Sequence, residues 1–174
     1  MLELKKKGVF SMDTTILQKR YNSSRANLLW VVVLTAVNLI ILATGGESYF
    51  LFSASVPYIL TATMMALCGM FPPEFYVDWD TSEPFFDQSF FYVALVISVV
   101  IIVFYLLCFL LSGKNRGGWL IAALVAFIVD TVAMFLYYGL DLSMIIDIVL
   151  HIYVVGSLIS GLIAHKKLKE LGEV

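Results

Sequence analysis

The stretch FFYVALVISVVIIVFYLLCFLL, residues 90–111, decides the fold of this chain. It carries no charged side chain, and it is as long as the roughly 20 apolar residues that a helix needs to cross the hydrocarbon core of a bilayer. The whole chain shares this character, because 61% of its 174 residues are hydrophobic and only 14% are charged. A soluble domain carries about 25% charged residues. The excess of apolar side chains therefore has to face lipid, and the composition predicts an all-α, polytopic integral membrane protein.

Three more stretches resemble residues 90–111 in length and hydrophobicity. We predict a single membrane domain with four transmembrane helices, which cover residues 26–44, 90–111, 119–140 and 144–164. A fifth apolar stretch, residues 48–71, is less suited to lipid because several hydroxyl side chains and Pro57 interrupt it. The polar remainder comprises a basic N-terminal region (1–25), an acidic aromatic loop (72–89) and a basic tail (165–174).

The basic residues fall into three clusters, at residues 5–25, 114–116 and 166–169. Lys and Arg in short loops remain on the cytoplasmic side of a membrane. If all three clusters are cytoplasmic, the chain crosses an even number of times between each pair of clusters. Residues 48–71 then do not cross, and we predict a short re-entrant or interfacial helix on the outer side of the cell membrane, with both termini cytoplasmic. The alternative is a fifth span that places the basic tail outside, against the charge rule.

The loop at residues 72–89 combines acidic and aromatic side chains and contains no Lys or Arg. Its acids are Glu74, Asp78, Asp80, Glu83 and Asp87. The aromatic side chains fit a belt at the level of the lipid headgroups, which is the structural interpretation. The functional alternative is an extracellular vestibule whose acids concentrate cations.

Three ionisable residues lie inside predicted spans: Asp130, Asp147 and His151. Such residues cost roughly 2.5–3.5 kcal/mol on insertion scales, and they are usually functional or paired. The last two spans form a tight hairpin around Asp141, and Asp130 and His151 lie at nearly equal distances from it along the chain. A rise of about 1.5 Å per residue puts both side chains about 15–16 Å from the turn, close to the bilayer midplane. Asp147 and His151 share a helix face because they are at positions i and i+4.

These three residues allow three interpretations. As a functional site, the acid–imidazole pair holds and passes a proton or binds a cation in mid-membrane. As a structural site, it is a polar clasp between two helices, and Asn38 in the first span fits either picture. The third interpretation is an intramembrane metal-dependent enzyme, for which Asp130, Asp147 and His151 form only a loose ligand signature. Since no HExxH or GxSxG motif accompanies them, we expect no metal, no cofactor and no catalytic activity.

Small residues on the last span mark faces where another helix can approach closely. Gly156 with Ser160 and Ser157 with Gly161 form two overlapping small-xxx-small pairs. The first pair lies nearly opposite His151 on a helical wheel, which predicts two packed faces on this helix. A chain this short seldom encloses a transport path alone, so we expect a homo-oligomer or a partner membrane subunit.

Three segments carry a resemblance to known proteins: YNSSRANLLW (21–30), FLFSASVPYIL (50–60) and LIAHKKLKEL (162–171). In these segments the chain is similar to a group of small polytopic membrane proteins of bacteria with a Gram-positive-type envelope. The likeness extends over most of the chain and implies a bacterial cytoplasmic membrane. The group has no assigned activity, so the resemblance implies a location and no function.

The sequence favours translocation of a small solute or an ion, linked to protons or cations, through an oligomer. The depth-matched pair of Asp130 and His151 below an acidic loop supports this hypothesis. The alternative is a non-transporting accessory or regulatory subunit of a larger membrane complex, which the small size and the small-residue faces support. No soluble segment carries a basic patch with interleaved aromatic residues, so we expect the lipid bilayer and no nucleic acid as a partner.

Overall fold

The computed structural model describes residues 2–46, 49–79, 85–113, 116–139 and 144–173, and within these ranges the chain forms helices and connecting segments but no strand. Four helices are long and apolar enough to cross a membrane, and another, α2, is shorter. The predicted fold class is therefore confirmed. The helices are α1 (Leu2–Ala43), α2 (Ser55–Leu67), α3 (Ser89–Leu111), α4 (Gly117–Tyr138) and α5 (Ile145–Glu170), with one 3-10 helix, η1 (Pro73–Tyr76).

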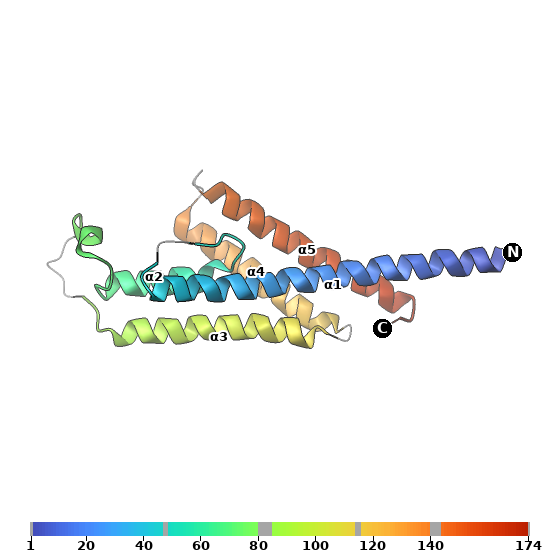
Figure 1. Ribbon diagram of the computed structural model, residues 1–174, viewed down its shortest axis with the longest axis horizontal. Coiled ribbons are helices and arrows are strands. Elements are labelled where there is room, and N and C mark those ends of the chain that lie inside the picture. Colours follow the sequence, from blue (N-terminus) through green and yellow to red (C-terminus); the bar gives the residue numbers. More distant parts are fainter. Residues whose placement is uncertain (1, 47–48, 80–84, 114–115, 140–143, 174) are drawn as a thin grey trace.

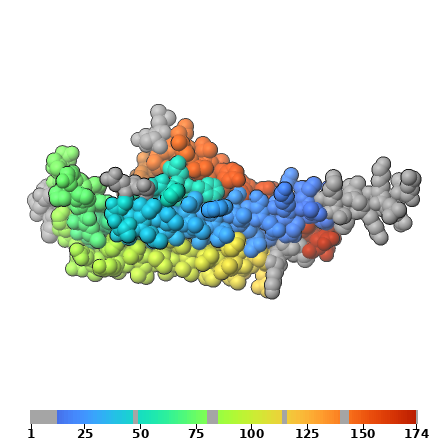
Figure 2. Space-filling view, viewed as in Figure 1, coloured from blue at the N-terminus to red at the C-terminus, as the bar shows by residue number. Residues whose placement is uncertain are grey.

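The helices form one bundle, in which α1 packs against α5, α3 and α2 (Figure 1). Both termini lie at one end of the bundle, which we call the termini end. The opposite end, which we call the loop end, carries the connections from α1 to α2 and from α2 to α3. Figure 2 shows α1 lying along one side of the molecule between α3 and α5, with the green connection from α2 to α3 covering the loop end.

Helix α1 begins well before the predicted first span. It is continuous from Leu2 to Ala43, and its part from Asp13 to Ala43 is apolar enough to cross a membrane. The predicted boundary at residue 26 marks only a change from polar to apolar side chains, because no Pro or Gly lies between residues 9 and 43 to interrupt the helix. Residues 2–25 are thus part of the same helix as the first span. The beginning of α1 projects beyond the bundle at the termini end (Figure 1), and Tyr21 and Ser24 are buried inside it.

Four residues with a predicted role lie outside the described part of the chain. They are Asp80 and Glu83 of the acidic loop, Lys114 of the second basic cluster and Asp141 of the hairpin turn. The helices that flank Asp141, α4 and α5, are packed neighbours of opposite direction, as a hairpin requires (Figure 1).

The segment between α1 and α3 enters the bundle and returns to the same end. Residues 49–54 run back alongside α1 as a non-helical segment, and α2 then runs outward to the loop end (Figure 1). Hydrogen bonds record this path. The side chain of Asn38 bonds to the backbone of Phe50, and the Thr35 hydroxyl, one turn deeper in the bundle, accepts the N–H of Ala54 at 2.8 Å. The segment is therefore re-entrant, and its deepest point is the first turn of α2.

The side chain of Asn38 supplies hydrogen bonds to backbone groups of the non-helical segment, which have no backbone partner in the described chain. Its amide nitrogen donates to the Phe50 carbonyl and its amide oxygen accepts the Phe50 N–H, both at 2.7 Å. The same nitrogen lies 2.9 Å from the Ser53 hydroxyl. Irregular backbone is stable at membrane depth only where protein groups satisfy it, and an unpaired buried group costs about 1–3 kcal/mol. Asn38, which is 1% exposed, therefore serves the fold as a partner for backbone.

A cluster of aromatic rings covers the loop end of α2. The helix stops at Gly69, whose φ of +68° favours glycine, and the Phe85 ring packs where a Cβ would project. The Tyr76 hydroxyl donates to the carbonyl of Ala66, near the end of α2, at 3.1 Å. The rings that contact one another are those of Phe71, Phe75, Tyr76, Trp79 and Phe85. The described part of the predicted acidic loop is thus a packed aromatic cap.

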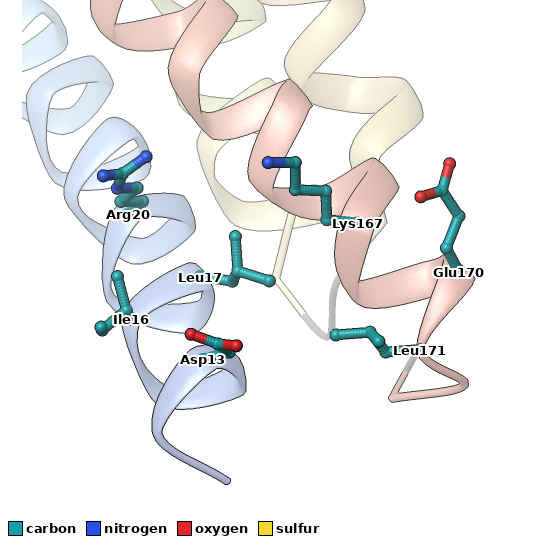
Figure 3. A pocket seen from close by; sticks show the side chains of 7 residues that line it. All are labelled: Asp13, Ile16, Leu17, Arg20, Lys167, Glu170 and Leu171. Atoms are coloured by element: carbon teal, nitrogen blue, oxygen red, sulfur yellow. The ribbon is translucent and has the colours of Figure 1, made fainter. Parts of the chain in front are cut away.

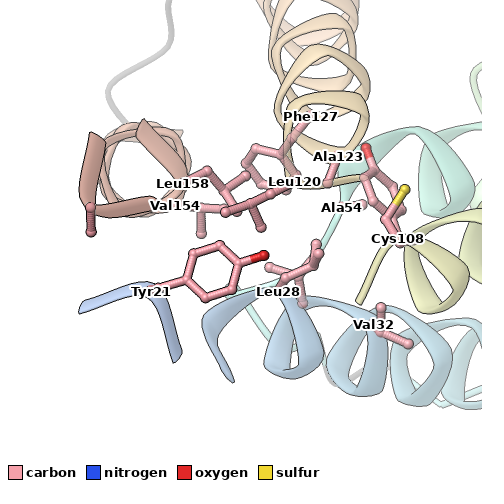
Figure 4. Close-up of a cluster of buried hydrophobic side chains, with 13 residues drawn as sticks. Tyr21, Leu28, Val32, Ala54, Cys108, Leu120, Ala123, Phe127, Val154 and Leu158 are labelled. Atoms are coloured by element: carbon pink, nitrogen blue, oxygen red, sulfur yellow. The ribbon is translucent and has the colours of Figure 1, made fainter. Parts of the chain in front are cut away.

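The half of the bundle toward the termini end has an apolar core built from α1, α4 and α5 (Figure 4). Its central side chains are at most 1% exposed: Leu28, Leu120, Ala123, Phe127, Val154 and Leu158. Helix α3 contributes less, because its buried residues form a single narrow stripe that includes Ser98 and Cys108. Most of the surface of α3 therefore faces lipid or another protein.

The predicted small-residue faces of α5 differ in what they contact. Ser157 and Gly161 pack on α1: the Ser157 carbonyl accepts a hydrogen bond from the Ser24 hydroxyl, and a Cβ on Gly161 would meet Ser24 at 2.5–2.6 Å. Gly156 and Ser160 are exposed, and a Cβ on Gly156 would meet nothing within 4 Å. Within the described chain only the face of Ser157 and Gly161 is packed, and the predicted second packed face, with Gly156 and Ser160, stays a prediction.

This difference predicts opposite outcomes for two matched substitutions. Gly161→Val forces α1 and α5 apart and should destabilise the purified protein by about 1–3 kcal/mol. Gly156→Val adds the same side chain to an open surface and should change stability by less than about 0.5 kcal/mol. Unfolding of both variants in detergent measures the difference. Equal losses would show that the contact between α1 and α5 is not the one described.

Candidate functional site

Asp130 lies inside the bundle, 3% exposed and roughly 12 Å from the loop end of α4. Its carboxylate meets the first turn of the re-entrant helix. One oxygen accepts the N–H of Ser55 at 2.9 Å, and the other accepts the N–H of Val56 at 2.8 Å. Hydrogen bonds to a charged group contribute about 1.5–3 kcal/mol each, so this contact fixes the inner end of α2 to the middle of α4.

The two hydrogen bonds complete the first turn of α2. A helix leaves its first four N–H groups without partners inside the helix, and the N-cap residue here, Ala54, has no side chain that could accept one. The N–H of Ala54 goes to Thr35, those of Ser55 and Val56 go to Asp130, and Pro57 has none. Asp130 thus acts as a cap from another helix, and its negative charge lies at the positive end of the α2 dipole.

His151 joins the same carboxylate from α5. Its Nε2 lies 3.3 Å from the Asp130 oxygen that binds Ser55 N–H, and 3.2 Å from the Ser55 hydroxyl. Its Nδ1 lies 2.9 Å from the backbone carbonyl of Asp147. The Phe127 ring stacks on the imidazole with centroids 5.1 Å apart. The structure therefore brings Asp130 and His151 together, with Ser55 as a third member.

These distances leave one proton to be placed between Asp130 and His151. A carbonyl only accepts, so Nδ1 carries a hydrogen and donates to Asp147. If Nε2 also carries a hydrogen, the imidazolium faces the carboxylate. If Nε2 carries no hydrogen, it accepts a hydrogen bond from the Ser55 hydroxyl. The neighbouring Asp130 oxygen then needs a proton, because otherwise its lone pair would face the lone pair of Nε2. In both arrangements one proton lies between the two side chains, on Nε2 in the first and on Asp130 in the second.

Asp147 lies one turn of α5 closer to the loop end. It is 6% exposed, and its Oδ1 has no hydrogen-bond partner among the described residues. Its side chain therefore does not join Asp130 and His151, although its backbone carbonyl orients the imidazole. No group of three or more His, Cys, Asp or Glu in the described part of the chain is placed to hold a metal ion. The structure therefore does not bring Asp130, Asp147 and His151 together as one set of ligands.

The surroundings of the site differ between the two ends of the bundle. Toward the loop end, Ser55 is followed by Tyr49, whose hydroxyl interacts with Ser53 and Ser55 and whose ring is only half-buried. Toward the termini end, Phe127 covers His151, and the apolar core follows (Figure 4). Polar groups thus connect the site to the loop end, and apolar packing closes it from the termini end.

Two hollows lie elsewhere on the surface. A groove of about 420 Å³ between α3 and α4 reaches Asp130 from the lipid side, and its other lining residues are Val56, Val100, Ile101, Phe104, Tyr105, Ala126 and Val129. A cleft of about 560 Å³ at the termini end separates α1 from the end of α5 (Figure 3). Asp13, Arg20, Lys167 and Glu170 line this cleft with exposed charges of both signs. The groove thus borders the site at Asp130, whereas the cleft at the termini end is lined by exposed charges.

Several site residues had no distinct signal in the sequence. Ser55 and Val56 act through their backbone N–H groups, which every residue except proline has, and Tyr49 is one of nine tyrosines. The available signal was the combination of Pro57, which suits a first helical turn, with an upstream Ala54 that cannot cap it. A buried helix start without a cap requires an acceptor elsewhere, and Asp130 is the acid in the next-but-one span.

Comparisons with models of protein families, with curated proteins and with solved structures gave no match to this chain.

The contact between Asp130 and His151 predicts coupled effects on stability. Asp130→Ala or His151→Ala alone should cost about 3–5 kcal/mol, because each leaves buried polar groups unpaired. The double variant should cost less than the sum of the singles by roughly 0.5–3 kcal/mol. Unfolding of the purified protein in detergent measures the cycle. Thr44→Ala, which shares no hydrogen bond with Asp130, is the control and should be additive with it; additivity in both cycles would mean that the two side chains do not meet.

Proposed function

We propose that the protein binds a proton at the contact between Asp130 and His151 and uses it to drive translocation of an ion or small solute across the membrane. The observation that carries the proposal is the buried contact between Asp130 and His151, held by the inner end of α2. Ionisable residues at this depth usually mark ion pathways and proton relays. In transporters, the N-termini of half-spanning helices point at charged groups near the midplane. The proposal includes no catalytic step.

Loss of the proton weakens the contacts that hold α2 in place. Without it, a bare Nε2 faces the Asp130 carboxylate at 3.3 Å, and the two repel each other. The same carboxylate holds the N–H groups of Ser55 and Val56. A change that separates His151 from Asp130 therefore acts on the hydrogen bonds that position α2. Proton binding favours the described arrangement, and proton release favours one in which α2 has shifted.

The proposed setting is a bacterial cell membrane with the loop end outside and the termini in the cytoplasm. Basic side chains gather at the termini end, and the described acids of the loop end are Glu74, Asp78 and Asp87. Hydrogen bonds from the Ser89 side chain and backbone lower the pKa of Asp87, so this acid stays ionised at neutral pH. The exposed surface of α3 and the exposed pair of Gly156 and Ser160 support assembly with further copies or with a partner subunit.

A second candidate function is a non-transporting subunit of a larger membrane complex. The observation that favours it is the apolar core between His151 and the termini end, which leaves the single chain without a continuous polar path. In that case the contact between Asp130 and His151 is a clasp that holds α2, α4 and α5 together.

Reconstitution of the purified protein in liposomes separates the two candidates. A pH-sensitive dye inside the liposomes reports proton entry while potassium and an ionophore clamp the membrane potential. We expect the protein to accelerate pH equilibration and Asp130→Asn to reduce the rate roughly tenfold or more, because asparagine cannot take part in proton exchange. Thr44→Ala, which removes an exposed hydroxyl that bonds to carbonyls of its own helix, is the control and should retain the rate. A folded protein that leaves the liposomes no more permeable than empty ones would favour the subunit.

A further inference from the structure

Asp147 is a buried acid that the contact between Asp130 and His151 does not use. It is in the third position of α5, 6% exposed, with an Oδ1 that no described donor reaches. A buried carboxylate oxygen without a donor is costly when the group is ionised. The helix start gives partial compensation at most, because the dipole effect of a first turn is typically 0.3–1 kcal/mol. A proton on Asp147 removes this cost.

Asp147 lies where a proton that enters from the loop end could bind before it reaches His151. It lies about 6 Å closer to the loop end than His151, one helical turn away. Tyr49, in the non-helical segment, is close enough to interact electrostatically with Asp147, and the Tyr49 hydroxyl also interacts with Ser55. Ser55 in turn lies 3.2 Å from Nε2 of His151. The hydroxyls of Tyr49 and Ser55 therefore lie in sequence between the Asp147 carboxyl group and the imidazole.

The titratable groups of the described chain that interact with Asp147 belong to this same region. They are His151 on its own helix, Tyr49 from the segment before α2 and Tyr138 at the loop end of α4. Asp130 shares with Asp147 the neighbours Tyr49 and His151. No Lys or Arg is among these groups, so no fixed positive charge competes with a proton for Asp147.

We propose that Asp147 is a second proton acceptor, which takes protons from the loop end and passes them to His151 through the hydroxyls of Tyr49 and Ser55. The carboxylic acid gives its proton to the Tyr49 oxygen, Tyr49 gives its own to the Ser55 oxygen, and Ser55 gives its own to the bare Nε2. Asp147 ends as a carboxylate and His151 as an imidazolium, while each hydroxyl keeps one hydrogen. The step from Asp147 to Tyr49 requires a bridging water or a small approach of the two side chains.

The proton on Asp147 is tested directly by infrared spectroscopy of the full chain in lipid bilayers. In Asp130→Asn, where Asp147 is the remaining buried acid of the described chain, a carboxylic acid band should be present near neutral pH. The band should be absent when Asp147→Asn is added to that variant and retained when Asp78→Asn, which removes an exposed acid of the loop end, is added instead. A band that persists in the variant that lacks both Asp130 and Asp147 would overturn the proposal. So would a band that sodium removes at constant pH, because Asp147 would then be a sodium ligand.

The relay rests on the proposed function, and its test is the proton flux into liposomes. Asp147→Asn and Tyr49→Phe should each slow the flux roughly tenfold or more. Tyr137→Phe, which alters an exposed ring on α4 whose hydroxyl bonds to Thr63, should not. If Asp130→Asn abolishes the flux while Asp147→Asn leaves it unchanged, the relay is wrong and the proposed function stands. If the unaltered protein carries no flux, the proposed function and the relay both fail, and the infrared band alone decides whether Asp147 holds a proton.

Discussion

The first four N–H groups of a helix have no partners within the helix, and they also lack water when the helix starts inside a membrane protein. Helix α2 starts in this way. Each unpaired group would cost about 1–3 kcal/mol, so the first turn is stable only where the surrounding helices supply acceptors. Thr35 of α1 and Asp130 of α4 supply them, and Pro57 removes the last of the four donors. The carboxylate is the strongest acceptor available, and its charge also meets the positive end of the helix dipole.

The other polar residues of the bundle follow from this constraint. The chain reaches the start of α2 through non-helical backbone, which Asn38 satisfies on one side. An ionised Asp130 in a low-dielectric setting needs more than two N–H groups for full compensation, and His151 provides a further donor when it is protonated. The proposed proton site is thus built from the same hydrogen bonds that hold α2. The proposal links proton occupancy to the fold because both depend on one carboxylate.

The spans and the re-entrant segment were predictable, because hydrophobicity and the placement of Lys and Arg report how each segment meets lipid and water. Asp130 and His151 were recognisable as unusual residues in apolar runs, and equal spacing from the turn placed them at one depth. The partners of Asp130 were not predictable, since Ser55 and Val56 bind it through backbone N–H groups, which almost every residue type has. The sequence also could not distinguish the contacts of Gly156 from those of Gly161. Residue spacing shows that a helix face has small side chains, but it does not show which neighbouring helix packs against that face.

The anchoring of α2 by Asp130 is the central claim, and solid-state NMR of the protein in lipid bilayers tests it most directly. With an isotope-labelled carboxyl carbon on Asp130 and labelled backbone nitrogens on Ser55 and Val56, the dipolar coupling between them reports their separation. Hydrogen bonds of 2.9 and 2.8 Å predict direct coupling of the carboxyl carbon to both nitrogens. A folded protein in which α4 gives its normal internal couplings but the carboxyl carbon couples to neither nitrogen would contradict the anchoring, and with it the proposed link between protonation and α2.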